Sequence, residues 1–146
     1  MKSKLHTAGW VILALVGALI VLGGLASARV AYTQASDPIV SGTTLVDVAA
    51  GREDVATALR ARRGTAAAYA AGYGVMLLAV ALGPFRRGDR WAFFAVLASA
   101  LTLAGLTLLR VPLLGSRAGA RTGLVQLGVV AVALLLGSGR MLSARE

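Results

Sequence analysis

Four long stretches of the chain consist almost entirely of apolar residues, and polar or basic segments separate them. The stretches cover residues 8–28, 64–83, 91–109 and 123–139. A helix needs about 20 residues to cross the roughly 30 Å apolar core of a bilayer. The stretches therefore predict four membrane-spanning helices, of which the last extends back toward Arg121. They are too long for membrane strands and lack a period of two.

These spans predict an all-α fold, an integral membrane four-helix bundle that forms one domain over residues 1–146. Only seven residues, 84–90, separate the second and third spans, so these spans are expected to be antiparallel neighbours. Each carries a face of small residues that permits close approach of another helix. The faces, which we expect to meet, are Gly64, Ala68 and Gly72, and Ala95, Ala98, Thr102 and Gly105.

The longest polar segment is the loop of residues 29–63. Thr43 or Thr44 can cap a short helix that runs through Ala50 and ends at Gly51. A second helical stretch opens at Arg52, with acidic residues in its first turn and arginines in its last, as the helix dipole favours. We expect both to lie at the interface in the first extracytoplasmic loop, the second running into the next span.

The first span has an alternative interpretation. Ala26-Ser27-Ala28 follows a basic N-terminus and resembles a signal-peptide cleavage site. The apolar region of a signal peptide has about 7–15 residues, whereas this span has 21, which favours an uncleaved anchor. Cleavage after Ala28 would leave three spans, and the sequence leaves this choice open.

Charge distribution predicts the orientation of the spans. Both termini and the 84–90 turn share one side, with seven Lys and Arg in 21 residues, against eight in 48 residues on the other side. The positive-inside rule therefore predicts that both termini and the 84–90 turn lie in the cytoplasm. The net charge of +9 lies at the ends of apolar runs, so we do not expect a nucleic-acid partner.

Reactive groups are scarce in this sequence. It has no cysteine, and its single histidine, His6, is expected to be an interfacial residue in the polar segment before the first span. Asp, Glu, Lys, Arg and His are missing from all four spans, which argues against a transporter, a pump or an intramembrane hydrolase. We predict no catalytic residue, no metal site and no cofactor.

Four acidic residues in the 29–63 loop are the remaining candidates for surface chemistry: Asp37, Asp47, Glu53 and Asp54. They could form a metal site or an acid–base pair at the membrane surface, but they lack the spacing of a calcium loop. The simpler interpretation is that they solvate the loop and balance its arginines.

Three polar residues within the spans are candidates for lining a ligand cavity. Tyr69 and Tyr73 share a face of the second span, and Gln126 is the strongly polar residue of the last. Buried hydroxyl and amide groups need hydrogen-bond partners, which a quinone headgroup, a lipid or a neighbouring helix could supply.

The segment Phe85-Arg86-Arg87-Gly88-Asp89-Arg90-Trp91-Ala92 resembles a sequence in small bacterial four-helix membrane proteins of the broad DoxX-like kind. The resemblance extends over residues 64–109 and the four-span layout. It implies a compact four-helix bundle in a bacterial inner membrane. Some DoxX-like proteins belong to membrane oxidoreductase systems, but no active-site pattern of such an enzyme can be placed on these residues.

Together these patterns predict a non-enzymatic structural or accessory membrane protein. Its expected partners are membrane lipids and either a second copy of the chain or a larger membrane protein. The alternative is a bundle that binds a lipid, a quinone or another small hydrophobic ligand, with Tyr69, Tyr73 and Gln126 lining its cavity.

Overall fold

The computed structural model describes residues 2–33, 38–40, 43–114 and 120–141. These residues are almost entirely helical, which confirms the all-α fold class. Four helical segments are long and apolar enough to cross a membrane: Lys4–Thr33, Glu53–Phe85, Arg90–Leu113 and Arg121–Gly139. The number of candidate spans and their order along the chain agree with the sequence prediction.

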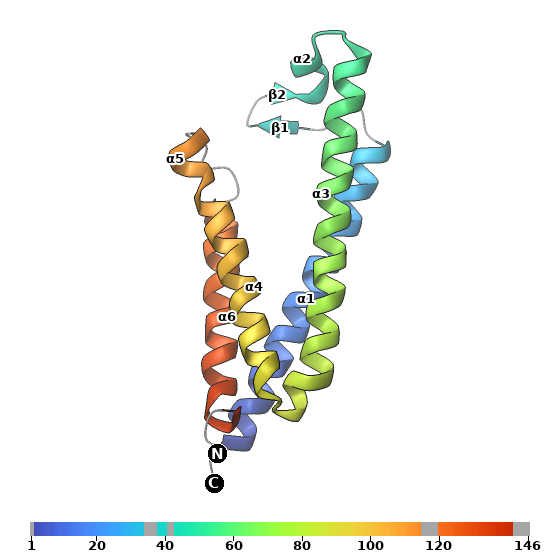
Figure 1. The fold of residues 1–146 in the computed structure, drawn as a ribbon. Coiled ribbons are helices and arrows are strands. Elements are labelled where there is room, and N and C mark those ends of the chain that lie inside the picture. The colour runs from blue at the N-terminus through green and yellow to red at the C-terminus, as the bar shows by residue number, and fades with distance from the viewer. Residues whose placement is uncertain (1, 34–37, 41–42, 115–119, 142–146) are drawn as a thin grey trace. The chain divides into compact units, whose positions relative to one another are not determined.

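The elements are labelled in Figure 1. The long helices are α1 (Lys2–Thr33), α3 (Glu53–Val80), α4 (Arg90–Leu108) and α6 (Ala120–Met141). The short elements are the strands β1 (Pro38–Val40) and β2 (Thr43–Thr44), the helices α2 (Leu45–Ala49) and α5 (Arg110–Leu114), and the π-helix η1 (Ala81–Phe85), which continues α3.

The chain divides into two compact units, which are described separately. Unit 1 contains Met1–Gly17 and Met76–Glu146, and unit 2 contains Ala18–Val75. Helices α1 and α3 therefore each contribute one part to unit 1 and another to unit 2.

In unit 1, α4 packs against α6, and Figure 1 shows the two helices side by side. The buried face of α4 consists of Ala92, Val96, Ala100 and Ala104, spaced every four residues. Small side chains at this spacing let two helices approach closely. The face predicted from the sequence was a different one: Ala95, Ala98, Thr102 and Gly105 are exposed. This helix has two small-residue faces, and the structure buries Ala92, Val96, Ala100 and Ala104.

The first part of α1 also packs against α6 in unit 1. A Cβ atom placed on Gly9 would lie 2.8 Å from the carbonyl oxygen of Ala133 and 3.2 Å from the backbone nitrogen of Gly137. The α1 backbone thus lies directly against the α6 backbone. Only a glycine permits this approach without displacing one helix.

In unit 2, the second part of α1 packs against α3 in the same way. A Cβ on Gly24 would lie 2.8 Å from the backbone nitrogen of Ala71 and 3.0 Å from the carbonyl oxygen of Ala67. Gly64 lies against the ring of Tyr32, so the predicted small face of the second span contacts α1 at this position. Its other members, Ala68 and Gly72, are exposed.

The loop between α1 and α3 contains the strands β1 and β2 and the helix α2. Strands β1 and β2 pair antiparallel, with Pro38 opposite Thr44 and Val40 opposite Thr43. The sequence did not predict these strands. It did predict the short helix α2 and its end, where Ala50 and Gly51 adopt positive φ angles of 48° and 78°. As expected, the second helical stretch continues without a break into the apolar part of α3.

Helix boundaries differ most from the prediction at α1, which covers residues 2–33 rather than 8–28. The flanking polar residues continue the helix because nothing in them breaks it. The predicted connection 110–122 likewise begins with the helical turn α5. The remaining spans start or end within a few residues of their predicted limits.

Candidate functional site

The three cavity candidates belong to different units. Tyr69 and Tyr73 lie on α3 in unit 2, and Gln126 lies on α6 in unit 1. Tyr69 is 77% exposed, whereas Tyr73 and Gln126 are half-buried. The two pockets described below are lined by other residues. A role for these three side chains in ligand binding therefore stays a prediction.

Asp47 stabilises the start of the short helix α2. Its Oδ2 atom accepts hydrogen bonds from the Thr44 hydroxyl at 2.7 Å and the Thr44 backbone N–H at 2.8 Å, while the Asp47 N–H approaches Thr44 Oγ1 at 3.3 Å. This reciprocal pattern is a capping box at the start of α2. The hydrogen bonds from Thr44 lower the pKa of Asp47 below its usual value of 3.8.

The other acidic candidates do not converge on Asp47. Asp54 Oδ2 forms an ion pair with Arg52 at 2.7 Å on the exposed start of α3. Glu53 is exposed at the same helix start, and Asp37 lies outside the described residues. Among the residues that the structure describes, no three His, Cys, Asp or Glu side chains group closely enough to hold a metal ion.

Arg60 caps the end of α1 in unit 2. Its Nε donates to the carbonyl oxygen of Ala31, and its Nη2 donates to that of Tyr32, both at 3.0 Å. These carbonyls are among the last in α1 and lack partners within the helix, so a cation there is favourable. The contact lines a shallow pocket of about 320 Å³, formed by Ala31, Tyr32, Thr57, Arg60 and Ala61. We interpret it as a structural contact.

The basic turn after η1 is held by backbone hydrogen bonds. The carbonyl oxygen of Pro84 accepts from the N–H groups of Gly88 and Asp89, at 3.1 and 3.0 Å. Gly88 has a φ of 91°, a conformation that residues with a side chain rarely adopt. Arg87 lies 3.9 Å from the Asp89 carboxylate in an exposed ion pair.

His6 lies against this turn and is buried, contrary to the expectation of an interfacial residue in a polar segment. Its side chain is 1% exposed. Its Nε2 lies 3.1 Å from the carbonyl oxygen of Arg86, and its ring stacks on Phe85 with the centroids 5.9 Å apart. Because a carbonyl only accepts, Nε2 carries the proton and donates it. Nδ1 is buried with no hydrogen-bond partner among the described residues.

The burial of His6 is indicated in the sequence by the spacing of its neighbours, although the composition of the segment is polar. His6, Gly9, Leu13 and Gly17 recur at spacings of three and four, and all four are buried on one face of α1. This is the helical period of a packed face. The three lysine and serine residues around His6 make the segment appear polar, although the helical face already begins there.

The basic turn also carries a cation–π contact. The Arg86 guanidinium carbon lies 5.1 Å from the ring centroid of Trp10, on α1. The turn, His6 and Trp10 therefore form one cluster in unit 1, in which α1 contacts both the backbone and the side chain of Arg86.

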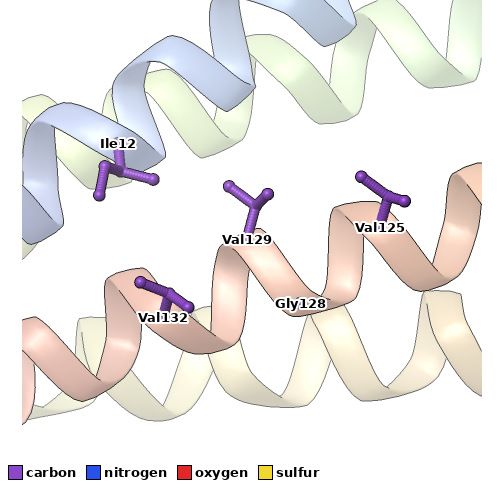
Figure 2. Close-up of a pocket in the computed structure, with 5 residues that line it drawn as sticks. All are labelled: Ile12, Val125, Gly128, Val129 and Val132. Carbon is purple, nitrogen blue, oxygen red and sulfur yellow. The ribbon is translucent and has the colours of Figure 1, made fainter.

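An open apolar groove of about 400 Å³ lies between α1 and α6 in unit 1 (Figure 2). Ile12 lines it from α1, and Val125, Gly128, Val129 and Val132 line it from α6. Its volume is near the lower limit of ordinary ligand pockets, which are about 300–1,000 Å³. Its lining residues present no polar side chain, so they can contact a hydrocarbon group but cannot bind a carbonyl or hydroxyl by a side-chain hydrogen bond.

Comparisons with protein-family models, with curated proteins and with solved structures give no match to this chain.

Proposed function

We propose that the protein is a multi-pass component of a bacterial cytoplasmic membrane, with both termini and the 84–90 turn in the cytoplasm and the α2 region on the other side. Its proposed role is structural or accessory, through packing against a second copy of the chain or a larger membrane protein. Four apolar helices and the uneven distribution of basic residues support the location.

The observation that carries the proposed role is the exposed small-residue face of α4: Ala95, Ala98, Thr102 and Gly105. A Cβ on Gly105 would meet no atom of another helix within 4 Å in the described part of the chain. In a bilayer, small residues at this spacing allow another helix to approach closely, as the opposite face of α4 does with α6. We propose this face as the contact with a second copy.

The absence of cysteine from the sequence allows a direct test. A single cysteine at Ala98 should give a disulfide-linked dimer in native membranes under mild oxidation. A single cysteine at Leu135, which is 73% exposed on α6, serves as the control for random collision. Equal cross-linking at both positions, or a solubilised protein that stays monomeric and co-purifies with no other protein, would contradict the proposed role.

Reporter fusions test the orientation separately. A reporter inserted at Gly88 should be cytoplasmic, and one inserted at Gly51 should be external. An external reporter at Gly88 would reverse the proposed topology without affecting the proposed self-association.

The second candidate function is binding of a small hydrophobic ligand, favoured by the groove at Ile12 and Val129. An apolar lining suits a lipid acyl chain or a quinone tail better than a polar headgroup. Gly128→Leu should fill the groove and reduce the lipid or quinone retained in native mass spectrometry. Gly72→Leu, at another glycine with open space around it, is the control. Wild-type protein that retains neither type of molecule would remove this candidate.

A further inference from the structure

Contacts at both the backbone and the side chain fix the position of Arg86. Its carbonyl oxygen accepts the hydrogen bond from His6, and its guanidinium group lies over the indole ring of Trp10. The 5.1 Å separation is within the roughly 6 Å range of cation–π contacts. Both partners come from α1, so the two contacts hold Arg86 against a single helix.

The charge of Arg86 has no counterpart among the described residues. Its neighbour Arg87 pairs with Asp89, whereas Arg86 has no carboxylate within ion-pair distance in the described part of the chain. The Arg86 side chain is also exposed. Stacking on an indole uses the face of the guanidinium and leaves its in-plane N–H donors available.

Unit 1, which contains Arg86, exposes both basic and aromatic side chains. Lys4, Arg87 and Arg90 are exposed in the same unit. So are the large rings of Trp91 and Phe94, which follow directly in α4. A cation beside exposed aromatic rings at the end of apolar helices is typical of the headgroup level of a membrane.

We propose that Arg86, held over Trp10, binds the phosphodiester group of an anionic phospholipid. The planar fork of an arginine matches two phosphate oxygens, and a guanidinium that is already positioned loses little conformational freedom on binding. Any positively charged surface attracts anionic lipid. The contacts with His6 and Trp10 distinguish Arg86 from the other basic residues as a specific binding group. The proposal rests on the membrane location proposed above and is independent of self-association.

Trp10 itself can report on the lipid. Trp91→Phe leaves Trp10 as the only tryptophan. This variant is reconstituted into phosphatidylcholine vesicles that contain phosphatidylglycerol, and either lipid is supplied with brominated acyl chains, which quench the tryptophan. The ratio of the two quenching efficiencies gives the lipid preference independently of the starting fluorescence. We expect phosphatidylglycerol to be enriched about fivefold near Trp10.

Two variants with the same change in charge separate a specific site from general attraction. Arg86→Gln should abolish the enrichment, and Arg87→Gln should leave most of it. An equal loss in both variants, or no enrichment in the unsubstituted reporter, would overturn the lipid site.

Two further outcomes distinguish related explanations. Displacement of the lipid by inorganic phosphate at constant ionic strength would identify a site for soluble anions and overturn the proposal. If neither brominated lipid quenches Trp10, the membrane location itself fails. Equal quenching by both lipids instead overturns the lipid site and leaves the membrane location in place.

Discussion

His6 Nε2 lies 3.1 Å from the carbonyl oxygen of Arg86, a residue 80 positions away in the chain. Arg86 directly follows η1, near the end of the continuous α3–η1 helical segment, where carbonyl oxygens lack partners within the helix. A side chain from α1 supplies the donor. The first and second apolar segments are thereby joined by a partly buried polar contact.

Removing this donor should destabilise unit 1. His6→Phe keeps an aromatic ring on Phe85 but removes the donor to the partly buried carbonyl oxygen of Arg86, at a cost of about 0.5–1.5 kcal/mol in the free energy of unfolding. The measurement is denaturant unfolding in detergent micelles. Leu5→Ala, at the exposed neighbouring position, is the control. An unchanged stability of His6→Phe would show that the hydrogen bond contributes little.

Gly9→Ala should separate α1 from α6. The new methyl group would lie 2.8 Å from the Ala133 carbonyl oxygen, and backbone atoms cannot rotate away as a side chain can. Overpacking of this kind costs about 1–3 kcal/mol. Gly23→Ala on the same helix has open space around it and should not lower the stability. The melting temperatures of both variants are measured by thermal unfolding under identical conditions. Equal melting temperatures would contradict the close approach of α1 to α6.

Arg60→Gln should loosen the end of α1. It removes two hydrogen bonds from a charged donor to the carbonyl oxygens of Ala31 and Tyr32. Amide hydrogen exchange in residues 27–33 should accelerate roughly tenfold or more, because hydrogen bonds to charged groups contribute about 1.5–3 kcal/mol each. Arg62→Gln changes the charge equally at an exposed position and should leave this exchange unchanged.

Acid should weaken the capping box of α2. The pKa of Asp47 is lowered in the folded chain, so the stabilisation is complete at neutral pH and is lost as the pH falls through the lowered pKa, below 3.8. Hydrogen exchange in residues 45–49 should therefore show less protection, relative to the intrinsic rate, at pH 3 than at pH 6. Asp47→Asn should remove this pH dependence, whereas Glu53→Gln should retain it.

The sequence was sufficient to predict the four apolar helices, the short helix after Thr44 and the continuation of the next helical stretch into the second span. These features depend on the length of apolar runs and on capping residues, which are local properties. It could not select between the two small faces of α4, since Ala95 and Ala92 are equally suited to close packing. The position of the partner helix determines which face is buried. The burial of His6 depends on Phe85 and Arg86, which are distant in the chain. The candidate site at Tyr69, Tyr73 and Gln126 depends likewise on tertiary arrangement.

The π-helix at residues 81–85 determines the direction in which Arg86 faces. Each of its turns encloses one residue more than an α-helical turn, and Pro84 lies inside it. If residues 81–85 adopted α-helical spacing with the chain length unchanged, the extra residue would turn Arg86 by about 100° around the helix axis. Its carbonyl oxygen would then leave His6 and its guanidinium would leave Trp10 together. A sequence change that favours α-helical spacing here would keep every apolar residue and still remove the proposed lipid contact, so related sequences can diverge in function at this segment without changing their hydropathy.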